Sequence, residues 1–274
     1  MSKYGLIAGN GRFPILALEE ARKLGDEVVV IAIKDEAAPE IAALAAPAKV
    51  HWITIAQLGQ LIDILKTEGV TQAMMCGQVK HVSIFSSLRP DWRLAKLLLS
   101  LKERNTDALI GGVIDVLAAE GIEVVDSTRL LKPLLATAGV LTTRKPTADE
   151  EKEVRYGRRL AAALSAFDVG QSVVIASRAC VALEAMEGTD AMLRRAASLA
   201  AGHRMTLVKG SRRRGHLLFD VPVAGPATIA TMKETNTSIL AVDAGRTLLL
   251  DRAAMLDAAN QAGICVVAHA EPAP

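Results

Sequence analysis

Short apolar runs alternate with stretches of helical spacing through the first half of the chain. Residues 27–33 are apolar at every position after Glu27, which is typical of a parallel strand buried on both faces. The same reasoning predicts strands at residues 4–8, 27–33, 50–55, 71–76 and 123–126, and helices at 15–24, 56–68, 91–103 and 106–120. This alternation, with a glycine turn after the first strand, predicts a Rossmann-like parallel sheet.

The second half mixes helices with strands that run in both directions. Residues 171–176 and 180–185 are separated by a short turn, which predicts a hairpin. We also predict strands at 205–209, 238–242, 247–250 and 264–268, and helices at 149–164, at 252–261 and from a cap at Thr189 to about residue 200. The fold class is therefore α/β: an N-terminal Rossmann-like parallel-sheet domain followed by a second α/β domain with a mixed sheet.

A polar segment with a proline, residues 145–153, separates the two halves. We predict a Rossmann-like domain at 1–141, of the kind that binds nucleotides or phosphates, and a second α/β domain at 142–274. A chain of 274 residues exceeds the size at which a single core usually stops growing. Two domains therefore fit the length as well as the pattern.

Composition narrows the class of protein. The net charge of +2 and the aromatic content of 3% argue against a nucleic-acid binder, which needs a broad basic face and stacking rings. Three cysteines lie far apart without a C-x-x-C pair, which suits a reducing cytoplasm and gives no zinc framework.

No apolar run reaches the roughly 18 residues of a membrane span. We expect a cytoplasmic protein, and a peripheral contact with the inner membrane surface is left open. The leucine-rich run at 94–101 fits a buried helix better than a helix that faces lipid or a partner.

One carboxylate, Asp220, ends an apolar run that begins at Gly215. Gly225 and Pro226 then open a helix, with proline in the first turn, where its missing N–H costs nothing. An acid at a strand end beside a helix N-terminus is a common arrangement in active sites, and it is equally common in ordinary loops. The local pattern leaves both interpretations open.

The first glycine turn reads Gly9-x-Gly11-x-x-Pro14. A dinucleotide fingerprint requires a third glycine where Pro14 stands and an acid at the end of the second strand, where Lys34 comes first. A nicotinamide-dependent oxidoreductase is therefore the weaker alternative. The backbone of Gly11 and the guanidinium of Arg12 instead suit a phosphate or diphosphate, although a solvated Arg12 is an equal alternative.

Other candidate groups stand at predicted element ends. Gln78 follows a strand at the same sheet edge as the glycine turn, where an ordinary turn is the simpler interpretation. Lys209 precedes Arg212-Arg-Arg214, and this basic patch suits phosphate, an anionic membrane surface or a solvated loop.

Several acids stand at the predicted ends of elements in the second half: Asp168, Glu187, Asp190, Asp220 and Asp243. Mg²⁺ is usually held by one or two carboxylates plus substrate phosphates, so one such acid suffices for a site.

Five motifs occur in order along the chain and together resemble the LpxI family of UDP-2,3-diacylglucosamine pyrophosphatases. They are Gly5-Leu-Ile-Ala-Gly-Asn-Gly-Arg-Phe-Pro14, Phe167-Asp-Val-Gly-Gln171, Glu187-Gly-Thr-Asp190, Phe219-Asp-Val-Pro-x-x-Gly-Pro-x-Thr228 and Leu240-Ala-Val-x-Ala-Gly-x-Thr-Leu-Leu-Leu-Asp251. Each motif alone is weak, but the resemblance covers nearly the whole chain.

This resemblance implies a Mg²⁺-dependent, cytoplasmic hydrolase of lipid A biosynthesis that forms a homodimer and holds its lipid-linked UDP-sugar substrate between two domains. The products would be UMP and 2,3-diacylglucosamine 1-phosphate (lipid X), formed by attack of water on the sugar-side phosphorus. Asp220 would be the catalytic residue and metal ligand. Substrate-binding candidates are Gly11, Arg12, Gln78, Thr189 and Lys209. A non-catalytic lipid- or nucleotide-binding protein is the further alternative.

The chain departs from the family pattern just before Asp220. Many relatives carry Gly-Gln-Asp at that point, whereas this chain reads Gly215-His-Leu217. If that upstream aspartate were the essential group, the assignment of catalysis to Asp220 would fail.

Overall fold

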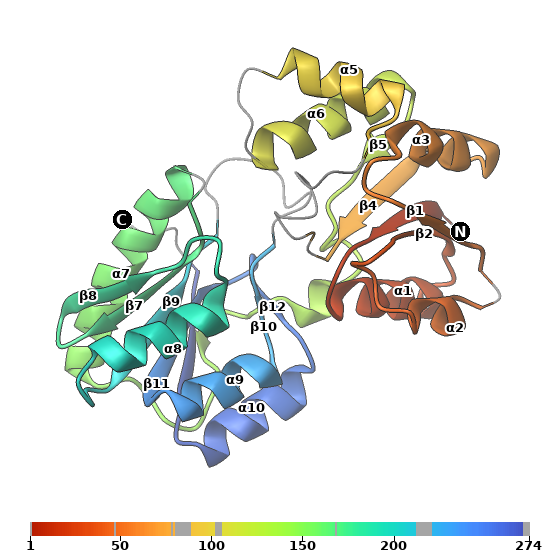
Figure 1. The fold of residues 1–274 in the computed structure, drawn as a ribbon. Coiled ribbons are helices and arrows are strands. Elements are labelled where there is room, and N and C mark those ends of the chain that lie inside the picture. The colour runs from red at the N-terminus through yellow and green to blue at the C-terminus, as the bar shows by residue number, and fades with distance from the viewer. Residues whose placement is uncertain are drawn as a thin grey trace. The chain divides into compact units, whose positions relative to one another are not determined.

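The chain folds into two compact units, which divide between Leu131 and Lys132. The computed structural model describes residues 2–46, 48–77, 79, 89–101, 106–167, 169–211 and 221–270. The boundary at residue 141 lies further along the chain and stays a prediction. Figure 1 shows the two units, each with its own sheet and helices. Within the described residues, no helix has the length and apolar character needed to cross a membrane.

The first unit is built on a five-stranded parallel sheet of order β3-β2-β1-β4-β5. Its strands are β1 (Lys3–Ala8), β2 (Glu27–Ile33), β3 (Val50–Ile53), β4 (Gln72–Cys76) and β5 (Glu123–Val124). The six residues of β2 after Glu27 are all buried, as a parallel strand covered on both faces requires. The predicted Rossmann-like sheet is confirmed.

Helices cover both faces of this sheet (Figure 1). They are α1 (Phe13–Lys23), α2 (Ile41–Ala45), α3 (Leu58–Thr67), α5 (Trp92–Ser100) and α6 (Thr106–Ala119). Leucines and isoleucines of α3, α5 and α6 form one core with Val29, Ile31 and Ile33 of β2. These buried side chains recur along each helix at the helical spacing predicted from the sequence.

The order of the strands places a switch point between β1 and β4. The chain moves outward from β1 to β2 and β3, then returns to add β4 on the other side of β1. In doubly wound sheets, ligands bind beyond the carboxyl ends of the strands at such a point. Residues that follow Ala8 and Cys76 therefore occupy the place where a nucleotide or phosphate site is expected.

The second unit is built on a six-stranded mixed sheet of order β6-β13-β11-β9-β7-β8. Strands β9 (Met205–Lys209), β11 (Thr237–Asp243) and β13 (Cys265–His269) are parallel, whereas β6 (Gly139–Val140), β7 (Ser172–Ala176) and β8 (Ala179–Leu183) run antiparallel to their neighbours. The predicted hairpin is the β7–β8 pair. The mixed sheet predicted for this domain is confirmed.

One long helix covers one face of the second sheet, and three shorter helices cover the other. Helix α7 (Ala148–Ala166) forms a core with Val173, Ile175 and Val208. Helices α8 (Thr189–Leu199), α9 (Pro226–Glu234) and α10 (Arg252–Gln261) pack on the opposite face. Helix α9 begins at Pro226, as its sequence predicts, with Gly225 as the cap.

The predicted strand at 247–250 does not join the main sheet. Instead, β12 (Leu248–Leu249) pairs in parallel with the short strand β10 (Val223–Ala224), which the sequence pattern did not indicate. Leu248 also forms an isolated bridge with Leu135, just after the 3₁₀ turn at Lys132–Leu134. The strand expected up to Asp220 lies outside the described residues.

Candidate functional site

The glycine turn after β1 is tied directly to the end of β4. The backbone N–H of Gly9 donates to the carbonyl of Cys76 at 2.8 Å. Gly11 has a φ of +91°, a conformation that glycine adopts without strain. Arg12 caps the start of α1, and its carbonyl accepts the N–H of Leu16 at 3.0 Å. The turn therefore exposes both Gly11 and Arg12 at the switch point.

Gly77 allows the two turns at this point to approach each other closely. Its φ is +90°, and a Cβ at this position would lie 2.5 Å from the carbonyl oxygen of Asn10 and 3.1 Å from the Pro14 ring. A side chain would therefore collide with backbone atoms that cannot rotate away. Proline at position 14 packs in this corner, where a dinucleotide fingerprint would place its third glycine. Gln78, the next candidate, lies outside the described residues.

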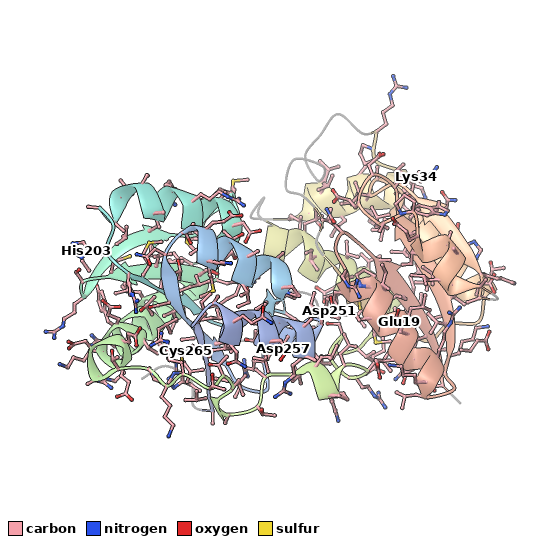
Figure 2. All side chains as sticks on the ribbon, turned by 90° about the horizontal axis from the view of Figure 1, so that it is seen from below. Glu19, Lys34, His203, Asp251, Asp257 and Cys265 are labelled. Carbon is pink, nitrogen blue, oxygen red and sulfur yellow. The ribbon has the colours of Figure 1, made fainter. Side chains whose placement is uncertain are left out.

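This turn can hold an anion but lacks the ribose acid of a nicotinamide site. The Arg12 side chain forms no capping hydrogen bond with α1, and Pro14 contributes no N–H to the first turn. The other backbone N–H groups of a helix's first turn are suited to an anionic ligand. Lys34, labelled in Figure 2, directly follows β2 and is exposed where the dinucleotide pattern requires an acid. The geometry favours a phosphate or diphosphate over a nicotinamide cofactor.

A surface pocket of the first unit lies at the other end of its sheet. It is lined by residues near the strand starts, among them Lys3, Glu27, Lys49 and Glu68. Lys3 pairs with Glu27 at 2.7 Å, and Lys49 pairs with Glu68 at 3.0 Å. Because these charges neutralise one another, we place no function in this pocket. The switch point remains the candidate site of this unit.

In the second unit, Lys209 ends β9 at the carboxyl edge of the parallel strands. Its ammonium donates to the carbonyl of Val223 at 2.9 Å. Three of the parallel strands end at this edge, in Lys209, Asp243 and His269. An ammonium group is a compact positive charge with three donors, a chemistry that suits a phosphate oxygen.

Asp243 is the centre of a half-buried cluster at this edge. Its Oδ2 accepts the backbone N–H of Ser211 at 2.7 Å and the Ser211 hydroxyl at 2.8 Å. Its Oδ1 lies 3.3 Å from the guanidinium of Arg158, a residue of α7. The two charged side chains are only 16% and 11% exposed, so they are poorly screened by solvent. The sequence pattern marks Asp243 as one of five element-end acids that could serve a Mg²⁺ site, but it gives no signal for Arg158.

His269 lies next to Asp243, because the two residues are register partners on β13 and β11. Burial lowers the pKa of His269 from its ordinary value, and the neighbouring Arg158 lowers it further against the opposing effect of Asp243 and Glu151. The imidazole is therefore neutral near pH 7. Its Nε2 is buried without a hydrogen-bond partner among the described groups.

Thr189 is the first residue of α8 and not its cap. The cap is Gly188, whose φ of +80° is accessible to glycine, so the predicted cap was one residue late. The Thr189 hydroxyl donates to Glu184 Oε1 at 2.8 Å and lies 3.4 Å from the Ser172 hydroxyl. Sequence analysis did not detect Glu184, although it directly follows β8. The role of Thr189 in substrate binding stays a prediction.

Some predicted site residues belong to the first unit, some belong to the second, and others lie outside the described residues. Gly11 and Arg12 belong to the first unit, whereas Thr189 and Lys209 belong to the second. Asp220 and the arginines at 212–214 lie outside the described residues. The structure therefore describes two separate edges with site-forming chemistry, one in each unit.

Among the described residues, no group of three or more His, Cys, Asp or Glu side chains is close enough to hold a metal ion. Asp243 stands at a suitable strand end, but its oxygens already accept Ser211 and contact Arg158. A carboxylate engaged in this way does not fit the role of a Mg²⁺ ligand. Asp251, at the start of α10 in Figure 2, has a φ of +46°, and its backbone carbonyl accepts the N–H of Met255.

The fold and the glycine turn define a two-domain α/β protein whose first domain has a nucleotide-binding topology. Residues 3–134 match the model of the LpxI N-terminal domain, and residues 137–267 match that of the LpxI C-terminal domain. The chain therefore belongs to the LpxI family.

A curated relative and several solved structures are similar to the chain. UDP-2,3-diacylglucosamine pyrophosphatase LpxI from Caulobacter vibrioides is 29% identical over 277 aligned positions, covering 97% of each chain. A biotin carboxylase domain of a thermophilic 2-oxoglutarate carboxylase is 12% identical with a TM-score of 0.28, covering 65% of this chain and 35% of its own. The biotin carboxylase subunit of pyruvate carboxylase is 12% identical with a TM-score of 0.27, covering 73% and 42%. TM-scores this low do not support any inference about the function of the chain.

Proposed function

We propose that this protein hydrolyses the diphosphate of UDP-2,3-diacylglucosamine, giving UMP and 2,3-diacylglucosamine 1-phosphate, as a step of lipid A biosynthesis. The observation that carries the proposal is the match to both LpxI domains in order, together with the alignment of the Caulobacter vibrioides LpxI over 97% of the chain. A cytoplasmic location and a homodimer are further parts of the proposal, and the family resemblance supports them.

The first unit supplies the anion-binding part of this proposal. The exposed turn at Gly11 and Arg12 stands at the switch point of a parallel sheet, and the Arg12 side chain forms no capping hydrogen bond with α1. Backbone N–H groups at a helix N-terminus and a guanidinium both favour a diphosphate. Gln78 would add hydrogen bonds to sugar or phosphate oxygens from the end of β4.

The reacting part would come from Asp220 together with two residues of the second unit, Lys209 and Thr189. Asp220 would accept a proton from the attacking water, and the positively charged ammonium group of Lys209 would hold a diphosphate oxygen. Thr189 would contact the sugar or a phosphate oxygen. Mg²⁺, with Asp220 as its candidate ligand, would neutralise charge on the diphosphate when bound.

The reaction balances as a simple hydrolysis. The oxygen of water forms a bond to the sugar-side phosphorus, and the bond from that phosphorus to the bridging oxygen breaks. UMP leaves with the bridging oxygen, and Asp220 takes the proton that water loses. Phosphoryl transfer depends mainly on positioning and charge neutralisation, which is why few side chains suffice.

Turnover in ¹⁸O-labelled water tests both the activity and the point of attack. The purified full chain is incubated with Mg²⁺ and UDP-2,3-diacylglucosamine, and both products are examined by mass spectrometry. We expect UMP without label and diacylglucosamine 1-phosphate with one labelled oxygen. Release of no UMP would overturn the function in favour of a carrier that binds and releases its ligand unchanged. Label in UMP would overturn only the point of attack.

A further inference from the structure

The outer face of α5 exposes two large apolar side chains on either side of a lysine. Trp92 is 69% exposed and Leu99 is 86% exposed, and the Lys96 side chain between them is also exposed. The three residues stand at positions i, i+4 and i+7, so they share one face of the helix. Sequence analysis favoured a buried helix for this run, and only its inner face meets that expectation.

Contacts on the inner side hold this helix firmly in place. Leu97 is buried in the core of the first unit, and a Cβ at Gly112 of α6 would lie only 2.6 Å from its side chain. Asp91 caps the helix by accepting the N–H of Leu94 at 2.9 Å, and its second oxygen accepts the N–H of Gly59 at 2.6 Å. The exposure of Trp92 and Leu99 is therefore a property of an anchored helix and not of a frayed end.

The charges around this face are mainly positive. Arg89 precedes the helix and is exposed, and Lys96 lies within the face. Arg93 pairs with Glu120 and stacks on the Trp92 ring, with its guanidinium carbon 5.7 Å from the ring centre. Asp91 directly precedes the helix, and its two oxygens are already engaged by backbone N–H groups. A partner that matches this face has a negatively charged surface and an apolar interior just below that surface.

We propose that this outer face of α5, formed by Trp92, Lys96 and Leu99, docks on an anionic lipid bilayer. A helix with a tryptophan, an aliphatic side chain and basic residues on one face is suited to the boundary between acyl chains and head groups. The choice of a lipid surface rests in part on the proposed function, since a substrate with two acyl chains resides in a membrane.

A contrasting apolar patch in the second unit does not have this charge pattern. Phe167 is 80% exposed and Met186 is 74% exposed, but Met186 lies between the acids Glu184 and Glu187 in the sequence. Carboxylates beside an apolar patch oppose contact with an anionic bilayer. The charge pattern therefore distinguishes α5 from the exposed Phe167 and Met186.

The two tryptophans of the chain, Trp52 and Trp92, permit a direct test. The Trp52→Phe variant of the full chain leaves Trp92 as its single tryptophan and is checked for folding by circular dichroism. It is mixed with substrate-free vesicles of phosphatidylcholine, with or without phosphatidylglycerol, some of them carrying brominated acyl chains. We expect a blue shift and bromine quenching of Trp92 that require phosphatidylglycerol. No quenching by anionic vesicles would overturn the proposal.

Matched substitutions test whether vesicle binding depends on this face of α5 in particular or on the charge and apolar area of the whole protein. We expect Leu99→Ser to weaken sedimentation with anionic vesicles at least about tenfold, and Lys96→Glu at least about fivefold. The controls are Leu199→Ser, which removes a leucine that is 60% exposed in the second unit, and Lys145→Glu, which reverses an exposed lysine. Equal losses in test and control variants would overturn the assignment to α5.

Two further measurements keep this proposal distinct from others. Light scattering without lipid reports whether Leu99→Ser dissociates an oligomer; dissociation with unchanged vesicle binding would assign the face to a second copy and overturn the proposal. Hydrolysis of substrate dispersed in detergent tests the proposed function separately. Because vesicle binding is measured without substrate, it supports or overturns membrane docking even if no UMP is released.

Discussion

Asp243 binds Ser211 through one carboxylate oxygen, which accepts both the backbone N–H at 2.7 Å and the side-chain hydroxyl at 2.8 Å. The second oxygen is thereby left facing Arg158 at 3.3 Å. This arrangement joins the ends of β9 and β11 to helix α7 at the carboxyl edge of the sheet. It fixes the backbone shortly after Lys209, a residue of the proposed site.

The first prediction concerns this carboxylate. Asp243→Asn keeps the shape of the side chain but removes the charge opposite the half-buried Arg158, so we expect a loss of about 2–4 kcal/mol in the free energy of unfolding. Urea denaturation followed by circular dichroism measures this change. Asp257→Asn is the control, because Asp257 is exposed on α10 (Figure 2). A loss as small as that of the control would show that the cluster contributes little to stability.

The second prediction concerns the close approach at Gly77. Gly77→Ala places a Cβ 2.5 Å from the Asn10 carbonyl oxygen, whereas Gly69→Ala, at a φ of +67°, meets no atom within 4 Å. We expect Gly69→Ala to cost about 1–2 kcal/mol from its backbone conformation alone. Gly77→Ala should cost more and should also displace the glycine turn, which raises KM for the nucleotide substrate.

Thermal unfolding and steady-state kinetics of the two alanine variants provide this comparison. The informative quantity is the difference between them, since both carry a similar conformational penalty. If Gly77→Ala matched Gly69→Ala in stability and in KM, the packing of the two turns would not matter for the site.

The third prediction concerns pH and the Arg144–Glu150 pair that supports the start of α7. The pKa of Glu150 is lowered to about 2, because hydrogen bonds from Arg144, Thr147 and Ser238 together outweigh the effect of burial, which raises it. A carboxyl group whose folded pKa is depressed stabilises the fold above its unfolded pKa. This contribution is therefore complete above about pH 4.5 and is lost as the pH falls toward about 2.

The pH dependence of the free energy of unfolding tests this assignment. Between about pH 4.5 and 2, wild type should lose stability more steeply than Glu150→Gln, which has no carboxyl group to titrate. Glu151→Gln is the neighbouring control, because Glu151 is exposed. Parallel curves for wild type and Glu150→Gln would contradict the assignment.

Much of the fold could be predicted because its strands follow simple periodic patterns. The apolar run of β2 and the start of α9 at Pro226 correspond closely to the structure. The two-residue strand β10 was missed, because two residues show no period and are held by pairing with Leu248 and Leu249 far along the chain. The pairing of two such short strands depends on tertiary contacts, which the local strand propensity of the sequence does not encode.

The sites were less predictable for the same reason. An acid at a strand end marked Asp243, but its partner Arg158 stands on a helix 85 residues earlier, with no local signal of the pairing. Glu184 was missed because the sequence motif directed attention to Thr189. At α5 the leucine-rich pattern indicated a buried helix, and only the structure separates its inner leucines from the exposed Leu99.

The last prediction concerns Asp220, on which the proposed mechanism depends. If its carboxylate accepts the proton of the attacking water or holds the metal, Asp220→Asn should lower kcat at least about a hundredfold. KM should change far less, because the nucleotide and phosphate contacts are assigned to Gly11, Arg12 and Lys209. Asp257→Asn is the control and should retain wild-type activity. An Asp220→Asn variant with full activity would move the catalytic role to another carboxylate, whereas a rise in KM alone would make Asp220 a binding residue.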